Sequence, residues 1–225
     1  MRTAILVPCY KRPEYTEKCI RALEKAQEYK DDFFFLVDDG SNDNTADILV
    51  SAKLPKSVIT SKNSVGLRRV ILDFFNRVID KDFDYISKVD NDCIVPKTWL
   101  DDILGVFSFG GVDILSPNVN PSQAAHTYGK KQDGLPYLPS KTIGGLWTMR
   151  KYLIENVQFE NHDISGIRGA FQILNQIIVE KEPVVGWLDK VTFEDIGHWS
   201  GTHPQHIPSE EHRQYSVEVG RRIAW

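Results

Sequence analysis

The sequence predicts an α/β fold in which helices flank a mainly parallel sheet, with a smaller subregion after it. Short apolar runs alternate with helical patterns over the first two thirds of the 225 residues, which is the order that βαβ units produce. The run Phe33–Val37 is continuously apolar, as is typical of strands buried on both faces of a parallel sheet. Polar clusters follow several of these runs, at the strand ends where open α/β sheets bind ligands.

Short apolar runs predict the strands of the first half of the chain. These runs are Thr3–Pro8, Phe33–Val37, Ser57–Ser61, Asp84–Val89 and Val112–Ser116. Helices are expected between them, because Pro13 suits a first helical turn and Asn42 or Asp43 suits a helix cap. The expected helices are Pro13–Tyr29, a helix from Asn42 or Asp43 to Lys53, Gly66–Asp80 and Lys97–Phe107.

The second half of the chain is less regular. Residues 118–140 are rich in Pro, Gly, Ser and Gln and predict a long binding loop. After it we expect strands at Thr142–Met149 and Pro183–Phe193 and helices at Ile164–Val179 and Ser209–Ile223. With no linker between these segments, the chain is interpreted as a single domain over residues 1–225.

Composition excludes several classes of function. A net charge of −4 does not suit non-specific nucleic-acid binding, which needs a basic surface. No run of about 18 apolar residues is present, so we expect no integral membrane association. Three cysteines without CxxC spacing indicate free thiols in a reducing compartment, and we expect a cytoplasmic protein.

The sharpest motif is Asp90-Asn91-Asp92, which follows a predicted strand directly. Two carboxylates at this spacing suit a hydrated divalent cation whose other ligands come from a diphosphate. The alternative interpretation is a polar strand-to-helix turn.

Two further polar turns follow predicted strands. Asp38-Asp39-Gly40-Ser41 places two acids where they can accept hydrogen bonds from a base or a ribose, or form an Asx turn. The segment from Asn63 to Arg68 includes Gly66 at the start of a helix, where free N–H groups favour phosphate. A plain helix start is the alternative.

Together these motifs resemble the family-2-like glycosyltransferases of the GT-A fold, a Rossmann-like architecture. The likeness starts with Pro8, Tyr10 and Arg12 after the first strand. It continues through the turn at Asp38 and Asp39, the Asn63–Arg68 loop and the Asp-x-Asp motif, in the same order along the chain.

The resemblance implies a role for each matching residue. Residues 1–117 would bind the nucleotide sugar, with Asp39 near the base or ribose and Asp90 near the ribose or a metal-bound water. Asp92 and His198 would hold Mn²⁺ or Mg²⁺. Residues 118–225 would bind the acceptor and carry out catalysis, with Gly144 and Gly145 near the sugar and the acceptor. Apart from the resemblance, the Trp147 ring suits stacking on the acceptor sugar, with a place in the core as the alternative. The residues expected at the donor are Pro8, Tyr10, Arg12, Asp38, Asp39, Asn63, Gly66, Arg68, Asp90 and Asn91.

The catalytic base has two candidates. Asp163 follows Gly145 and heads an amphipathic helix, whereas Glu194-Asp195 lacks a helix after it. We therefore expect Asp163 to be the general base, although His162 stands where the family has an acid.

These features predict a metal-dependent, inverting transfer of sugar from a nucleotide-diphosphate donor, with UDP expected, to an acceptor hydroxyl. A nucleotidyltransferase or pyrophosphorylase is one alternative, but the loop Cys9–Pro13 lacks the glycine that it would need. A non-catalytic sugar-binding module is the other.

Overall fold

The computed structural model describes residues 1–26, 31–119, 134–140, 145–159 and 167–196. Within them, strands and helices alternate through the first half, and nine strands form one mixed sheet. The strands are β1 (Thr3–Cys9), β2 (Phe33–Asp38), β3 (Lys56–Thr60), β4 (Tyr85–Lys88), β5 (Cys93–Ile94), β6 (Ile114–Val119), β7 (Leu138–Ser140), β8 (Trp147–Arg150) and β9 (Val185–Asp195).

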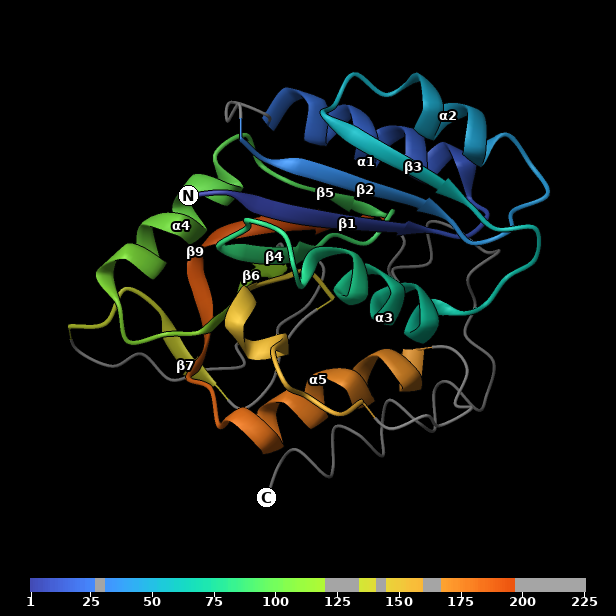
Figure 1. The fold of residues 1–225 in the computed structure, drawn as a ribbon. Coiled ribbons are helices and arrows are strands. Elements are labelled where there is room, and N and C mark those ends of the chain that lie inside the picture. Colours follow the sequence, from blue (N-terminus) through green and yellow to red (C-terminus); the bar gives the residue numbers. More distant parts are fainter. Residues whose placement is uncertain (27–30, 120–133, 141–144, 160–166, 197–225) are drawn as a thin grey trace, which may run out of the picture.

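The helices cover both faces of this sheet (Figure 1). They are α1 (Pro13–Ala26), α2 (Thr45–Ser51), α3 (Leu67–Val78), α4 (Trp99–Phe109) and α5 (Ile167–Lys181), with the short 3-10 helix η1 (Lys151–Ile154) after β8. One core lies between the sheet and α1, α2 and α4, and the other between the sheet and α3 and α5. Successive side chains of β1 pack into opposite cores, Ile5 into the first and Leu6 into the second, because side chains alternate between the two faces of a strand.

The strand order is β3-β2-β1-β4-β8-β6-β9-β5, and β7 pairs with β9. Strands β3, β2, β1 and β4 are parallel to one another, as the βαβ pattern predicts. Strand β8 runs antiparallel between β4 and β6. Because β3, β2, β1 and β4 are parallel, the carboxyl ends of these four strands lie at one edge of the sheet.

Most predicted elements are found, with shifted ends. Strand β6 extends to Val119, past the predicted end at Ser116, and α2 begins at Thr45. Asp43 still serves that helix start, since its Oδ1 accepts the Thr45 N–H at 2.9 Å. Strands β5 and β7 were not predicted, and β7 lies inside the expected loop. The helix expected at 209–223 lies outside the described residues.

Candidate active site

The turn after β2 and the loop after β3 are joined through one carboxylate. The Asp39 Oδ1 accepts the Val65 N–H at 2.7 Å, and Oδ2 accepts the Ser64 hydroxyl at 2.7 Å and the Gly66 N–H at 3.0 Å. Asp39 is 5% exposed. Hydrogen bonds to a charged acceptor are stronger than neutral ones, so Asp39 shapes the loop that leads into α3.

Gly40 allows these two segments to touch. Its φ is +77°, and a Cβ there would lie 2.5 Å from the Asn63 carbonyl carbon and 2.6 Å from the Ser64 nitrogen. The Asp38 Oδ1 completes the turn by accepting the Ser41 N–H at 3.0 Å.

The loop after β1 joins the turn after β4 through an ion pair. Arg12 Nη1 lies 2.7 Å from Asp92 Oδ2, and the two side chains are 23% and 16% exposed. Both Lys11 and Arg12 have positive φ, 56° and 63°, a backbone region that is costly for residues other than glycine. Such strain persists where the surroundings hold it.

Asn91 anchors that strained loop. Its Nδ2 donates to Thr16 Oγ1 at 2.9 Å and to the Lys11 carbonyl at 3.5 Å. The Lys11 N–H donates to Ser41 Oγ at 2.7 Å. Asn91 is 7% exposed, so it holds neighbouring loops together rather than facing the open edge.

Asp90 is held by a buried lysine that the sequence analysis did not single out. Lys88 Nζ forms an ion pair with Asp90 Oδ1 and donates to the Gly145 carbonyl at 2.8 Å. A Cβ on Gly145 would lie 2.7 Å from Asp90 Oδ2. The small residue expected at 145 therefore permits close approach of β8 to Asp90. The clue to Lys88 was a cation inside a predicted strand, two residues before the Asp-x-Asp motif.

Negative charge accumulates around Asp92. Burial, together with the carboxylates of Asp90 and Asp195, raises the pKa of Asp92 to about 6, although Arg12 opposes the shift. Asp195 belongs here because β9 pairs with β5 and the Ile196 N–H donates to the Asp92 carbonyl at 2.9 Å. That long-range pairing left no signal in the sequence.

The remaining expected site residues lie in different environments. Tyr10 is 46% exposed at the end of β1, whereas Pro8 is buried in that strand. Arg68 is buried in the first turn of α3. Trp147 is 1% exposed and packs edge-on against Phe75 in the core, so its ring serves packing and not the sheet edge. Asp163, His198 and Gly144 lie outside the described residues.

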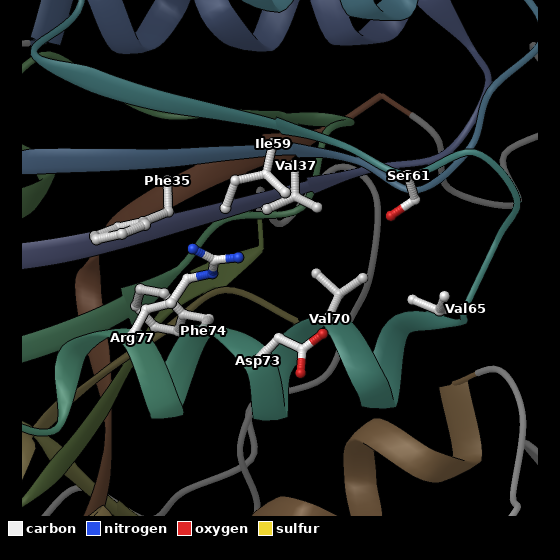
Figure 2. Close-up of a pocket in the computed structure, with 9 residues that line it drawn as sticks. All are labelled: Phe35, Val37, Ile59, Ser61, Val65, Val70, Asp73, Phe74 and Arg77. Carbon is white, nitrogen blue, oxygen red and sulfur yellow. The ribbon is translucent and has the colours of Figure 1, made fainter.

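A separate pocket lies between the sheet and α3 (Figure 2). Phe35 and Ile59 face it from the strands, and Phe74 and Arg77 face it from the helix. None of the site acids Asp39, Asp90 and Asp92 lines it. We therefore assign it to packing at the edge of the sheet.

The described residues hold no group of three or more acidic, histidine or cysteine side chains arranged to bind a metal ion. Over the same ranges, no helix has the length and apolar character needed to cross a membrane.

Comparison with known families decides the relationship. The family model for glycosyl transferase family 2 matches residues 4–181. The chain belongs to glycosyl transferase family 2. This confirms the resemblance drawn from the ordered motifs.

Solved structures share the fold of this family 2 chain. S. aureus TarS 1–349 superposes with a TM-score of 0.69 at 17% identity, covering 88% of this chain and 61% of that one. TarS 1–349 in complex with UDP-GlcNAc gives 0.69 at 19% identity, covering 100% and 66%. The mannosyltransferase PcManGT from Pyrobaculum calidifontis, in complex with GDP-Man and Mn²⁺, gives 0.68 at 15% identity, covering 97% and 64%.

These likenesses establish an α/β glycosyltransferase fold for the family 2 chain. The chain spans about three fifths of the length of TarS 1–349. No curated protein matches its sequence.

Proposed function

We propose that this chain transfers a sugar from a nucleotide-diphosphate donor, with UDP the expected nucleotide, to an acceptor hydroxyl. One observation carries the proposal: contacts at one edge of the sheet join the segments after β1, β2, β3 and β4. Asp39 joins the second to the third, the Arg12–Asp92 pair joins the first to the fourth, and the Lys11 N–H donates to Ser41 Oγ between the first and the second. Nucleotides bind at this kind of edge in open α/β sheets. The complexes of TarS with UDP-GlcNAc and of PcManGT with GDP-Man support a nucleotide sugar as the donor.

Features of the edge suit the parts of such a donor. The exposed ring of Tyr10 offers a face on which a base can stack. Helix α3 begins at Leu67 after Gly66, and its first-turn N–H groups and dipole favour a diphosphate. Asp39 contributes by holding Gly66 in place.

The residues near Asp92 fit Mn²⁺ or Mg²⁺. Carboxylate oxygens are the ligands that these ions prefer, and the nearby charges of Asp90 and Asp195 favour a cation beside Asp92. We propose Asp92 as one ligand and His198 as another. His198 follows Ile196 by two residues, a span of at most about 7 Å, and the Ile196 N–H contacts the Asp92 carbonyl. When bound, the metal would stabilise the charge of the departing diphosphate.

The proposed mechanism is a single displacement with inversion at the anomeric carbon. Asp163, as general base, accepts the proton of the acceptor hydroxyl while that oxygen attacks. Asp195 is the second candidate for this base, because the structure brings it beside Asp92. We also propose a cytoplasmic location, since Cys9, Cys19 and Cys93 are free thiols, as reducing compartments maintain.

Calorimetric titration of UDP with and without Mn²⁺ tests the donor and metal assignments. We expect Mn²⁺ to strengthen UDP binding to the wild type and to have no effect in Asp92→Ala, which lacks the ligand. Asp47→Ala, an exposed acid on α2, is the control and keeps the Mn²⁺ effect. Wild-type protein that ignores both UDP and Mn²⁺ would contradict the proposal.

Turnover measured on the same proteins tests the base. Asp163→Asn should lower turnover on the order of 100-fold or more while UDP binding is retained. Unchanged turnover in Asp163→Asn with loss in Asp195→Asn would transfer the role to Asp195. Release of pyrophosphate instead of nucleoside diphosphate would favour a nucleotidyltransferase.

A further inference from the structure

We propose that Arg12 is a built-in cation that occupies the Asp92 carboxylate until a metal bound to nucleotide diphosphate displaces it. This inference rests on the proposed function and adds a coupling between metal and donor. Free metal would bind weakly, because it must compete with the guanidinium for one carboxylate. Metal and nucleotide would then bind tightly only together.

The ion pair is placed directly on the expected metal ligand. Arg12 Nη1 contacts Asp92 Oδ2 at 2.7 Å, and both side chains are largely shielded from solvent. A guanidinium–carboxylate pair in such a setting is stronger than one on the open surface. The Arg12 guanidinium also lies 5.2 Å above the Tyr15 ring, which restricts its movement.

The loop that carries Arg12 is held in a strained shape. Lys11 and Arg12 are consecutive residues with positive φ. Four hydrogen bonds among the described residues hold the loop. Ser41 Oγ accepts the Lys11 N–H, Asn91 Nδ2 donates to the Lys11 carbonyl, and the Arg12 carbonyl accepts the Tyr15 and Thr16 N–H groups. Since Asn91 is the middle residue of the Asp-x-Asp motif, that motif itself places Arg12 against Asp92.

The other acid of the motif has its own cation. Lys88 neutralises Asp90 from inside the sheet, with its side chain 4% exposed. Among the residues that the structure describes, Arg12 is the cation paired with Asp92. The two pairs differ in access, because the Arg12 side chain is 23% exposed and Lys88 is buried. The Arg12 pair is therefore the one that an incoming ion can exchange.

After displacement, the Arg12 guanidinium can bind the diphosphate of the donor. A guanidinium released from Asp92 starts within hydrogen-bonding distance of the metal ligand, and the diphosphate must lie on that same metal. Arginine binds phosphate oxygens through a planar fork of N–H donors. When the metal replaces Arg12 at Asp92, the Arg12 guanidinium moves to the diphosphate. The Asp92 carboxylate and the guanidinium therefore each keep a partner of opposite charge.

Arg12→Met tests both roles proposed for Arg12, competition with the metal for Asp92 and binding of the diphosphate. The substitution removes the positive charge and keeps a long unbranched side chain. Mn²⁺ affinity, measured without nucleotide by the paramagnetic resonance signal of free Mn²⁺, should rise roughly 10-fold in Arg12→Met. UDP affinity in the presence of saturating Mn²⁺ should fall by a similar factor. Arg12→Lys should lie between the wild type and Arg12→Met in both measurements.

Arg21→Met is the matched control, since Arg21 pairs with Glu17 on the exposed face of α1, and it should change neither affinity. In Arg12→Met, a rise in Mn²⁺ affinity together with a fall in UDP affinity indicates the exchange. A structural defect would instead weaken the binding of both Mn²⁺ and UDP. Equal or weaker Mn²⁺ binding by Arg12→Met would overturn the inference while leaving the proposed function intact, provided that Mn²⁺ still strengthens UDP binding to the wild type. Absence of any Mn²⁺ binding, with or without UDP, would overturn both.

Discussion

The backbone of Gly40 passes so close to the loop after β3 that no side chain fits between them. The positive φ at this position is a second constraint, because residues with a Cβ rarely adopt it. Both constraints act where the Asp39 carboxylate must reach three donors.

We expect Gly40→Ala to lower the free energy of unfolding by about 2 to 4 kcal/mol, through backbone strain and overpacking. Chemical denaturation measures this change. Gly105→Ala is the control: Gly105 lies in α4 and a Cβ there meets nothing within 4 Å. It should be neutral or stabilising by up to about 1 kcal/mol. Similar stability of the two variants would contradict the close contact at Gly40.

For individual residues, the sequence predicted which acids belong to the site but not which groups those acids contact. Asp39, Asp90 and Asp92 interrupt apolar patterns at strand ends, so their positions could be predicted. Other neighbours come from distant segments, such as Gly145 beside Asp90 and Asp195 of β9 near Asp92. The prediction for Trp147 shows the same limit, because an aromatic ring beside Gly144-Gly145 suits a sugar site or a core equally well.

Between β8, α4 and β6, Arg150 acts as a clamp. Its Nε donates to the Val112 carbonyl at 3.2 Å and its Nη2 to the Phe107 carbonyl at 3.0 Å. The guanidinium also lies over the rings of Tyr85 and Phe107, at 5.8 and 5.3 Å. It therefore fixes the last turn of α4 against the sheet.

Arg150→Met should cost about 2 to 3 kcal/mol of unfolding free energy, because two carbonyls lose a charged donor and the cation–π contacts disappear. Urea denaturation compares it with Arg69→Met. Arg69 pairs with Asp73 on the surface of α3, and its loss should cost less than about 0.5 kcal/mol. Equal costs would show that the clamp does not stabilise the fold.

Elements with a clear period could be predicted, and very short ones could not. The apolar face of α1, with Cys19, Ile20 and Leu23 buried, repeats at helical spacing. Strands β5 and β7 have two and three residues, too few to show any period. Both depend on pairing with β9, a contact between distant parts of the chain.

For the whole molecule, the buried carboxyl of Asp32 links stability to pH. Burial raises the pKa of Asp32 to about 6, although the Thr3 N–H, which donates to it at 3.1 Å, opposes the shift. In the unfolded chain this pKa is about 3.9. The folded state therefore binds the proton more tightly, and stability falls as the pH rises from about 4 to about 6.

Asp32→Asn should remove this loss, since an amide oxygen can still accept the Thr3 N–H. We expect the variant to exceed the wild type in unfolding free energy by up to about 3 kcal/mol at pH 7.5, and by much less at pH 4. Denaturation across this pH range measures the difference. Asp80→Asn, at an exposed position after α3, is the control. A gap between Asp32→Asn and the wild type that does not change with pH would refute the linkage.

The insertion of β8 between β4 and β6 has a consequence for synthesis of the chain. Strand β4 ends at Lys88 and β6 at Val119, but the strand that pairs with both begins only at Trp147. A nascent chain that has not yet emerged to that point leaves a strand edge bare on each side of the gap, and bare edges invite pairing with other chains. Translation must therefore pass β8 before the sheet can close, so residues 1–119 have no complete sheet of their own.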